Sequence, residues 1–261
     1  MDAVTFAKEI EFYIRPATFP LAVKMLAAAD PVPEKAKRPF RDLKVQIAVC
    51  QAVSMARRYG WTFAVGREDI NCVLTKTAFG FEPELPYYTE GNCACGMYTE
   101  TKEAGAKTEA ATHRLPHGRY RYILVGPAAR ADYAPEAFVI YGNSAQVMRL
   151  VTGALWKRGG AITSSYTGRL DCSDEIIRTI LTGEYQVILP CYGDRIFGHT
   201  EDWEMAFALP ASKMDELVEG LKGTHAGGIR YPIPTFLRYA PSYPESYNKL
   251  EELWRGVGEK S

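Results

Sequence analysis

Residues 137–155, AFVIYGNSAQVMRLVTGAL, contain the two local patterns that decide the fold class of this chain. The run 137–141 is short, apolar and uninterrupted, which is typical of a buried strand. Asn143 or Ser144 then stands where a helix cap is expected, and apolar side chains recur at helical spacing as far as Leu155. The stretch therefore predicts a buried strand that is followed directly by an amphipathic helix.

The same alternation of helices and strands extends along the rest of the chain. Residues 45–59 have helical periodicity that stops at Gly60, and residues 62–65 and 161–166 resemble strands that follow the two helices. Further strands are expected at 119–125, 186–189 and 205–209, further helices at 73–79, 173–181, 211–221 and 247–255, and a long loop or lid at 82–117. These elements predict an α/β or α+β fold in a single domain, 1–261, around a mixed sheet.

A weak internal repeat relates the two helical units at an offset of 100 residues. Without a gap, 45–72 aligns with 145–172, and the glutamine, arginine, glycine and cysteine at positions 46, 58, 60 and 72 recur. We therefore expect two pseudo-repeated βαβ-like halves, about 14–96 and 119–200, followed by a C-terminal extension, 201–261. The alternative is a coincidence between two ordinary amphipathic helices.

The composition excludes several classes of function. The 261 residues carry 31 Lys+Arg and 31 Asp+Glu, so no net charge attracts a nucleic acid or an anionic membrane. No uncharged stretch approaches the length of about 20 apolar residues that a membrane-spanning helix needs. The first residues lack the basic and apolar regions of a secretory signal. We expect a cytoplasmic protein without nucleic-acid or membrane partners, and the sequence leaves a homo-oligomer open.

Six cysteines are the main candidates for chemistry, because cytosolic thiols stay reduced and serve as metal ligands or redox groups. The repeat matches Cys72 with Cys172, Cys191 follows a predicted strand, and Cys93 and Cys95 lie in the long loop. If the halves pack about a pseudo-twofold axis, four thiolates converge on one metal site. The sequence does not choose between Cys93 and Cys95 as the fourth ligand.

Converging thiolates suit a [4Fe–4S] cluster or, alternatively, tetrahedral zinc, because soft sulfur ligands select these centres. Two other interpretations are that the cysteines are inert buried thiols, or that they include a nucleophile or redox pair. Cys50 lies within the helix expected at 45–59 and is interpreted as a core residue. The sequence contains no zinc-finger, ferredoxin, dinucleotide-binding, P-loop or serine-hydrolase motif.

Charged side chains near predicted strand ends are candidates to bind an anion. The string 189–195, LPCYGDR, ends a strand and turns, which places the guanidinium of Arg195 where it suits a carboxylate or phosphate. Arg15 follows residues 12–14, taken here as the first strand, and is a second candidate. His199 is a weak candidate for a catalytic acid or base. The alternatives are surface ion pairs for the arginines and an ordinary surface histidine.

Six short strings occur in order along most of the chain: IRP and PLAVK within 14–24, CQA and AR within 50–57, NC at 71–72, and PCYGDR at 190–195. Together they resemble the ArCR proteins, domain of unknown function 169, a cysteine-containing family of archaea and anaerobic bacteria, and the likeness spans 14–221. The resemblance implies an intracellular protein of anaerobic type, which suits an oxygen-sensitive cluster, but it implies no reaction. Cys72, Cys172 and Cys191 fall on family-like positions, whereas Cys93 and Cys95 lie in a variable loop.

We therefore expect a metal- or iron–sulfur-binding protein that acts as a redox enzyme on a small anionic substrate. One alternative is a non-catalytic small-molecule-binding module with structural zinc or plain thiols. The other is a thiol-redox protein.

Overall fold

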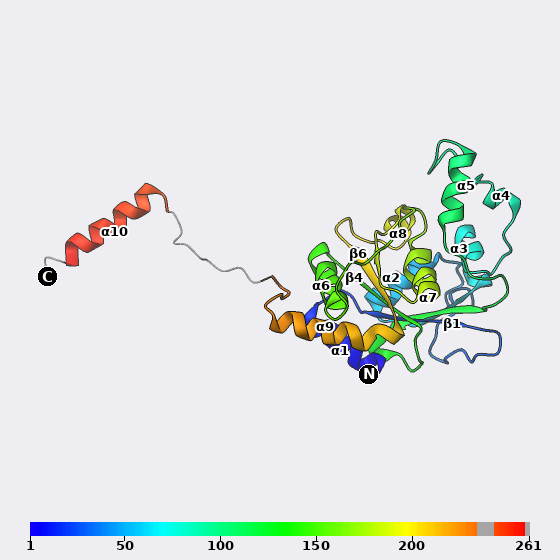
Figure 1. The fold of residues 1–261 in the computed structure, drawn as a ribbon, viewed down its shortest axis with the longest axis horizontal. Coiled ribbons are helices and arrows are strands. Elements are labelled where there is room, and N and C mark those ends of the chain that lie inside the picture. Colours follow the sequence, from blue (N-terminus) through cyan, green and yellow to red (C-terminus); the bar gives the residue numbers. More distant parts are fainter. Residues whose placement is uncertain (234–242, 259–261) are drawn as a thin grey trace.

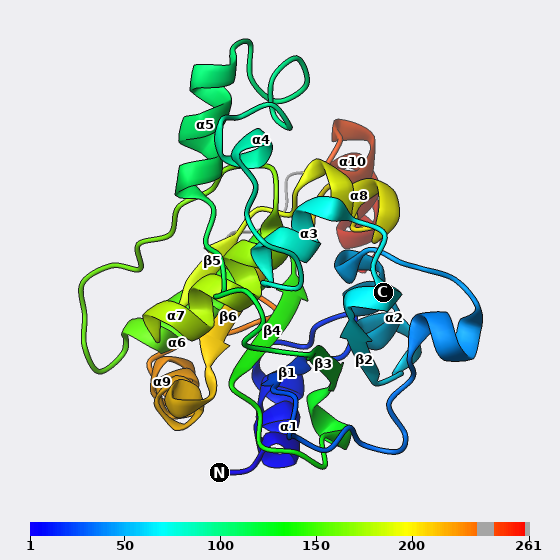
Figure 2. The ribbon, with the colours of Figure 1, turned by 90° about the vertical axis from the view of Figure 1, so that its right-hand side faces the viewer.

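The strands form one antiparallel sheet. The computed structural model describes residues 1–233 and 243–258, and its six strands have the order β2-β3-β1-β4-β6-β5, with every neighbouring pair antiparallel. Figure 1 labels β1, β4 and β6, and Figure 2 labels the other strands as well. The strands are β1 (Leu21–Leu26), β2 (Phe63–Gly66), β3 (Tyr122–Pro127), β4 (Ala137–Gly142), β5 (Gln186–Ile188) and β6 (Met205–Pro210). The mixed helix–strand fold class is confirmed, but the sheet itself is antiparallel rather than mixed.

Local sequence signals explain where two of the main helices begin and end. The helices are α1 (Ala3–Tyr13), η1 (Pro39–Leu43), α2 (Val49–Tyr59), η2 (Arg67–Asp69), α3 (Val73–Ala78), α4 (Pro86–Thr89), α5 (Lys102–Ala111), η3 (Ala128–Arg130), α6 (Ser144–Leu155), η4 (Ser173–Ile177), α7 (Arg178–Thr182), α8 (Tyr192–Phe197), η5 (Ala211–Lys213), α9 (Met214–Ala226) and α10 (Glu245–Gly258). Helix α2 ends at Gly60, whose φ of 73° is accessible to glycine at little cost. Helix α6 begins at Asn143, whose side chain accepts from the Gln146 N–H at 2.9 Å. Both features match the sequence prediction.

The strand order divides the sheet into two equivalent triplets. Strands β1 and β2 are parallel with β3 between them, and β4 and β5 are parallel with β6 between them. Each triplet is therefore a split βαβ unit, in which a helix connects two parallel strands and the third strand is inserted later. Helix α2 makes this connection in the first triplet, and η4 and α7 lead directly into β5 in the second.

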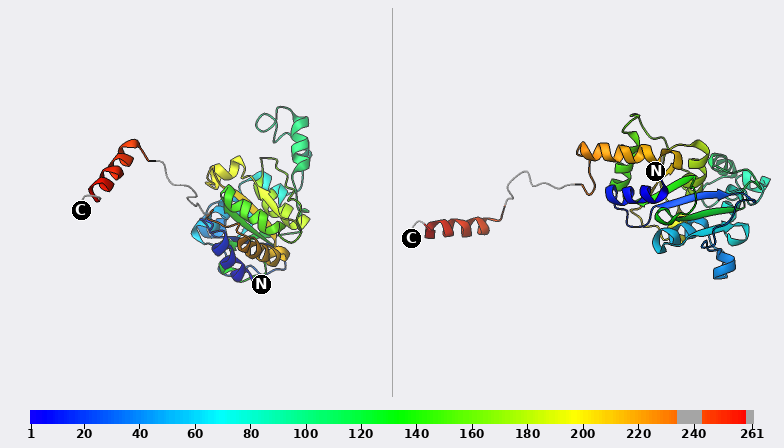
Figure 3. Two further views of the ribbon diagram at one scale, coloured as in Figure 1. Left: turned by 60° about the vertical axis from the view of Figure 1, so that its left-hand side comes forward. Right: turned by 90° about the horizontal axis from the view of Figure 1, so that it is seen from below.

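The two faces of the sheet are covered by different helices. Alternate residues of β1, beginning with Leu21, pack with α2, α3 and η4, whereas Ala22 and Phe138 on the other face pack with α1, α6 and α9. Figure 3 shows α1 and α9 together on that second face. Helices α2 and α6, which the 100-residue offset equates, therefore lie on opposite faces. A twofold axis normal to the sheet would relate only helices that lie on the same face. The sequence repeat, which equates α2 with α6, is therefore not confirmed.

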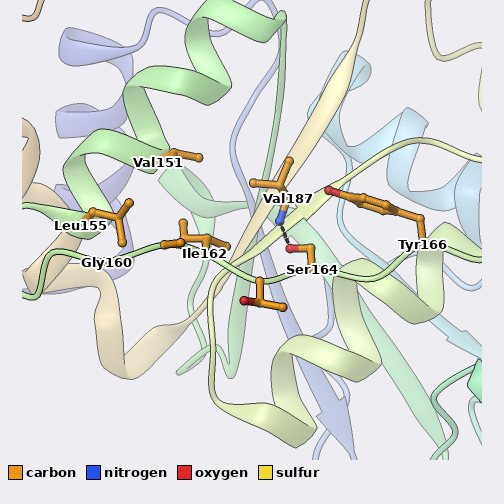
Figure 4. Close-up of a pocket in the computed structure, with 9 residues that line it drawn as sticks. Val151, Leu155, Gly160, Ile162, Ser164, Tyr166 and Val187 are labelled. Atoms are coloured by element: carbon orange, nitrogen blue, oxygen red, sulfur yellow. Dashed lines mark hydrogen bonds between the residues drawn. The ribbon is translucent and has the colours of Figure 1, made fainter.

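Three predicted segments differ from the structure. Residues 161–166 are not a strand: they run beside β5, where the Ser164 hydroxyl accepts from the Val187 N–H at 2.9 Å (Figure 4). Residues 12–14 end helix α1, so the first strand is β1. The loop expected at 82–117 contains α4 and α5. In the first two segments the local composition suits a strand, but packing decided the outcome. For α5, the cap at Thr101 and the Ala-, Lys- and Glu-rich run 102–111 are local helix signals that the prediction missed.

The stretch expected as a C-terminal extension contributes to the sheet itself. Strand β6 lies in that stretch and pairs with both β4 and β5, while α9 covers the sheet face beside α6. Residues 234–242 and 259–261 of the expected extension lie outside the described residues. Among the helices that the structure describes, none combines the length and the apolar character needed to cross a membrane.

Candidate functional site

Four of the six cysteines line one cavity beside the sheet. Cys50, Cys72, Cys172 and Cys191 contribute to a cavity of about 470 Å³. Each stands at or next to the first turn of a different helix: α2, α3, η4 and α8, respectively. Figure 2 shows α3 and α8 next to one another, below the segment that carries α4 and α5. Segments far apart in the sequence therefore bring four thiols to one place.

The ends of two strands explain the positions of two of these cysteines. Strand β5 ends at Ile188, and Pro190, which has no N–H to donate to a strand ladder, directly precedes Cys191. Cys191 is then the residue that caps α8. In the first triplet, β2 is followed by η2 and then by Cys72, which caps α3. Both cysteines therefore mark the point where the chain turns from a strand toward a helix at the cavity.

The two triplets relate the four cysteines in a different way from the sequence repeat. Cys50 and Cys172 begin α2 and η4, the helices that connect parallel strands on the same face. Cys72 and Cys191 follow β2 and β5, the outer strands of the two triplets. The strand order thus relates Cys50 to Cys172 and Cys72 to Cys191, whereas the 100-residue offset equates Cys72 with Cys172.

Cys50 faces the cavity instead of the core. Its side chain is partly exposed and lines the cavity, so the interpretation of Cys50 as a core residue is corrected. The apolar periodicity of α2 is real, but Cys50 lies in its first turn, ahead of the buried residues Ala52, Val53 and Ala56. A cysteine at the start of an amphipathic helix gives no local sign of which way its thiol points.

Other predicted site residues lie elsewhere in the described chain. Cys93 and Cys95 belong to the segment between α4 and α5, do not line the cavity, and the Cys95 thiol contacts the Glu100 carbonyl at 3.5 Å. The Arg195 guanidinium donates to the Glu201 carbonyl at 2.7 Å. Arg15 and His199 are exposed and also lie outside the cavity lining. The structure therefore brings together three of the five predicted ligands and neither predicted arginine.

Asp171 organises two of the cysteine positions and was missed by the sequence analysis. This buried carboxylate accepts from the Cys172 N–H at 2.8 Å, from the Cys191 N–H at 3.2 Å and from the Cys191 thiol at 3.3 Å. It thereby ties the starts of η4 and α8 together. Its position next to Cys172 was the available signal, but an acidic residue beside a cysteine is common in any sequence.

A chain of buried acidic groups leads from the cavity into the protein. Asp194 lines the cavity, accepts from the Thr200 hydroxyl at 2.6 Å, and has its pKa raised to about 7 by burial and by the nearby charge of Asp171. Behind it, Tyr141 donates to Glu175 at 3.1 Å. Burial, together with the charges of Asp171 and Asp194, raises the pKa of Glu175 well above its ordinary range. These carboxyl groups can therefore hold protons at neutral pH.

Burial also affects the thiols. It raises the pKa values of Cys50, Cys172 and Cys191 above the ordinary value for cysteine, and neighbouring carboxylates add to this effect. With pKa values raised in this way, these three side chains are neutral thiols at physiological pH. Deprotonating them requires a positive centre such as a metal, since a coordinated thiol loses its proton.

The spacing of potential ligands limits the kind of metal centre that the arrangement fits. Within residues 1–233 and 243–258, no three His, Cys, Asp or Glu side chains are grouped closely enough to hold a single metal ion. Cys50, Cys72, Cys172 and Cys191 line a common cavity without forming such a group.

Comparisons with known proteins place this chain in a family. The sequence profile of DUF169, described as uncharacterised ArCR, matches residues 9–220. The chain belongs to the DUF169 family. It is also similar to the uncharacterized protein MJ0308 of Methanocaldococcus jannaschii, with 25% identity over 205 residues that cover 77% of this chain and 86% of that protein. No solved structure matches this DUF169 protein.

Proposed function

We propose that this DUF169 protein binds a [4Fe–4S] cluster through Cys50, Cys72, Cys172 and Cys191 and uses it in redox chemistry on a small anionic substrate. The observation that carries the proposal is the meeting of four thiols, from four separate helix starts, at one cavity. Four cysteines are the usual ligands of such a cluster. The family membership gives the chain no reaction, so the proposal rests on this site.

The spacing favours a cluster over the zinc alternative. Tetrahedral zinc needs four sulfurs at about 2.3 Å from one ion, and in the described residues no three candidate ligands are that closely grouped. A cluster bound by all four cysteines would supply one-electron transfer. The protein itself holds the cysteine-bearing segments through Asp171 and limits water with the side chains of Leu74 and Leu170.

A thiol-redox function receives less support from the cavity cysteines. The reacting species in thiol exchange is the thiolate, and the raised pKa values of Cys50, Cys172 and Cys191 reduce its population. Cys93 and Cys95 are both partly exposed and are the cysteines to which such exchange would be assigned.

The test is anaerobic purification followed by analysis of iron, acid-labile sulfide and zinc. We expect brown protein with a charge-transfer absorbance at about 400 nm, as thiolate–iron clusters show. Cys50→Ser and Cys172→Ser are each expected to lose most of the iron and sulfide. The double variant Cys93→Ser/Cys95→Ser, matched in chemistry but outside the cavity, is expected to keep both.

The same variants separate the two possible ligand sets. Loss of iron in the Cys93→Ser/Cys95→Ser protein, with retention in Cys50→Ser, would favour the set expected from the sequence. Colourless wild-type protein with one equivalent of zinc would contradict the cluster and support the structural zinc module.

A further inference from the structure

Arg169 carries two buried hydrogen-bond donors without partners beside the cysteine cavity. The residue is 4% exposed and lines the cavity together with the four cysteines. Its Nη1 forms an ion pair with Glu109 of α5, a residue that is also buried. Its Nε and Nη2 atoms are buried and have no hydrogen-bond partner among the described residues. One edge of a buried guanidinium is therefore left without partners.

These two nitrogens form a matched pair. In a guanidinium group, Nε–H and Nη2–H lie side by side and point in the same direction, so together they can donate to both oxygens of one carboxylate. A buried donor without a partner is costly, and such groups in proteins generally find a water or a ligand. Glu109 compensates the charge of Arg169 at Nη1, so a ligand carboxylate would meet the buried donor pair Nε and Nη2 and not the ion-paired nitrogen.

The other groups around the cavity narrow the class of ligand. Leu74 and Leu170 supply apolar surface, which suits a short hydrocarbon body. Asp171 and Asp194 are carboxyl groups at or beside the same space, and they disfavour a second or third negative charge on the ligand. A monocarboxylate therefore fits better than phosphate, which carries more charge and has no apolar part.

We propose that Arg169 binds the carboxylate of a small monocarboxylic acid whose apolar part lies in the cysteine cavity. This inference deepens the proposed function, because it assigns a substrate class and an anchoring residue to the same cavity. It replaces Arg195 and Arg15 as the anion-binding groups. Glu109 then serves as a positioning residue, because it holds the guanidinium from the α5 side.

The test uses butanoate as the probe and calorimetric titration of the anaerobically purified protein. We expect butanoate to bind, its neutral analogue butanamide not to bind measurably, and inorganic phosphate to bind more weakly than butanoate. The double variant Arg169→Gln/Glu109→Gln removes both buried charges together, and we expect about 10- to 100-fold weaker butanoate binding. Arg169→Lys keeps the charge but lacks the parallel donor pair, and we expect it to bind more weakly than wild type.

A matched variant serves as the control. Arg195→Gln changes a guanidinium outside the cavity, so it is expected to bind butanoate like wild type. Equal binding of butanoate and butanamide, tighter binding of phosphate, or unchanged affinity in both Arg169 variants would overturn the assignment.

Iron and sulfide analysis of the same samples separates this inference from the cluster proposal. Butanoate binding that depends on Arg169 in protein without iron would support the carboxylate site and contradict the cluster. Iron-loaded protein that fails to bind butanoate would overturn the carboxylate site alone.

Discussion

Three buried carboxyl groups, Asp171, Glu175 and Asp194, lie at or behind the cysteine cavity, and their environments raise all three pKa values. Burial is the largest cause for each, since it penalises the ionised form. The groups also repel one another when charged. Their net cost is reduced by hydrogen bonds from Tyr141, Thr200 and the backbone of Cys172. Such a cluster makes the stability of the protein depend on pH.

Glu175→Gln is expected to flatten that pH dependence. The pKa of Glu175 is raised in the folded protein but is about 4.3 in the unfolded chain. At pH values between these two pKa values, unfolding releases a proton. Stability is therefore full below the unfolded pKa and falls as pH rises toward the folded pKa, by up to about 1.4 kcal/mol per pH unit for one group. Urea denaturation of the metal-free protein at several pH values between roughly 5 and 8 measures the slope of the unfolding free energy against pH. Glu11→Gln, a change on an exposed residue, should leave it unaltered, and an unaltered slope in Glu175→Gln would contradict the prediction.

Arg57→Met is expected to destabilise the protein strongly. Arg57 and Glu204 are almost fully buried and paired through two contacts of 2.6 and 2.9 Å, and the guanidinium lies over the Tyr141 ring. Removing the arginine leaves a buried carboxylate that retains the partly exposed Arg58 at 3.4 Å and the Glu201 N–H at 2.9 Å but no buried cation, which should cost about 3–5 kcal/mol. Thermal and urea denaturation measure the loss.

The comparison variants for this ion pair separate burial from charge. Arg67→Met breaks the exposed pair with Glu82, so a loss below about 1 kcal/mol is expected. Replacing both partners, as in Arg57→Met/Glu204→Leu, should cost less than Arg57→Met alone, because no unpaired charge remains buried. If Arg57→Met lost no more stability than Arg67→Met, the buried pair would not have the role assigned to it.

At the scale of elements, the sequence predicted those features that depend on nearby residues. Gly60 ends α2, Asn143 caps α6, and the apolar run of β4 is a strand, because each signal lies within a few residues of its effect. Residues 161–166 have a similar composition but border β5 through the Ser164 side chain, so long-range packing decided their conformation. Strand order is equally non-local, and no local pattern shows that β3 and β6 are inserted between parallel partners.

The crossing of α6 and α9 depends on two glycines, so Gly220→Ala is expected to destabilise it. A Cβ atom at Gly220 would lie 1.8 Å from the Gly153 carbonyl oxygen, and a backbone atom cannot move aside without separating the helices. We expect a loss of about 1–3 kcal/mol or more, although alanine is the better helix former. Circular dichroism melting measures it. Gly227→Ala is the matched control, because its Cβ would meet nothing closer than 3.5 Å; equal stability of the two variants would rule out the close contact.

For the whole molecule, the cavity shows how far the sequence could define the site. Cys72, Cys172 and Cys191 were predicted to meet through the 100-residue repeat and a pseudo-twofold axis, and the structure brings them to one cavity although that repeat is not confirmed. Cys50 was misassigned because its helix is amphipathic, and Arg169 carried no local signal because its importance lies in unpaired nitrogens. The fold joins the two triplets at the β1–β4 pair, and the cavity takes two cysteines from each triplet. Only the three-dimensional arrangement could show that each triplet contributes two cysteines to the cavity.

Because both triplets would supply ligands to the proposed cluster, its removal is expected to weaken the molecule as a whole. The cluster would bind the folded arrangement of Cys50, Cys72, Cys172 and Cys191 but not the unfolded chain, so it stabilises the fold by mass action. Binding at 100 times the dissociation constant adds about 2.7 kcal/mol, which corresponds to a Tm difference of roughly 5–10 °C for a domain of this size.

Calorimetry of anaerobic protein before and after oxidation and chelation measures the difference. The Cys93→Ser/Cys95→Ser variant should show the same decrease, since its ligands are intact. In hydrogen exchange, loss of protection should be greatest at the first turns of α2, α3, η4 and α8, and smallest where α1 and α9 cover the opposite face. Equal Tm values for the two forms, or a decrease absent from the Cys93→Ser/Cys95→Ser protein, would contradict a cluster held by the four cavity cysteines.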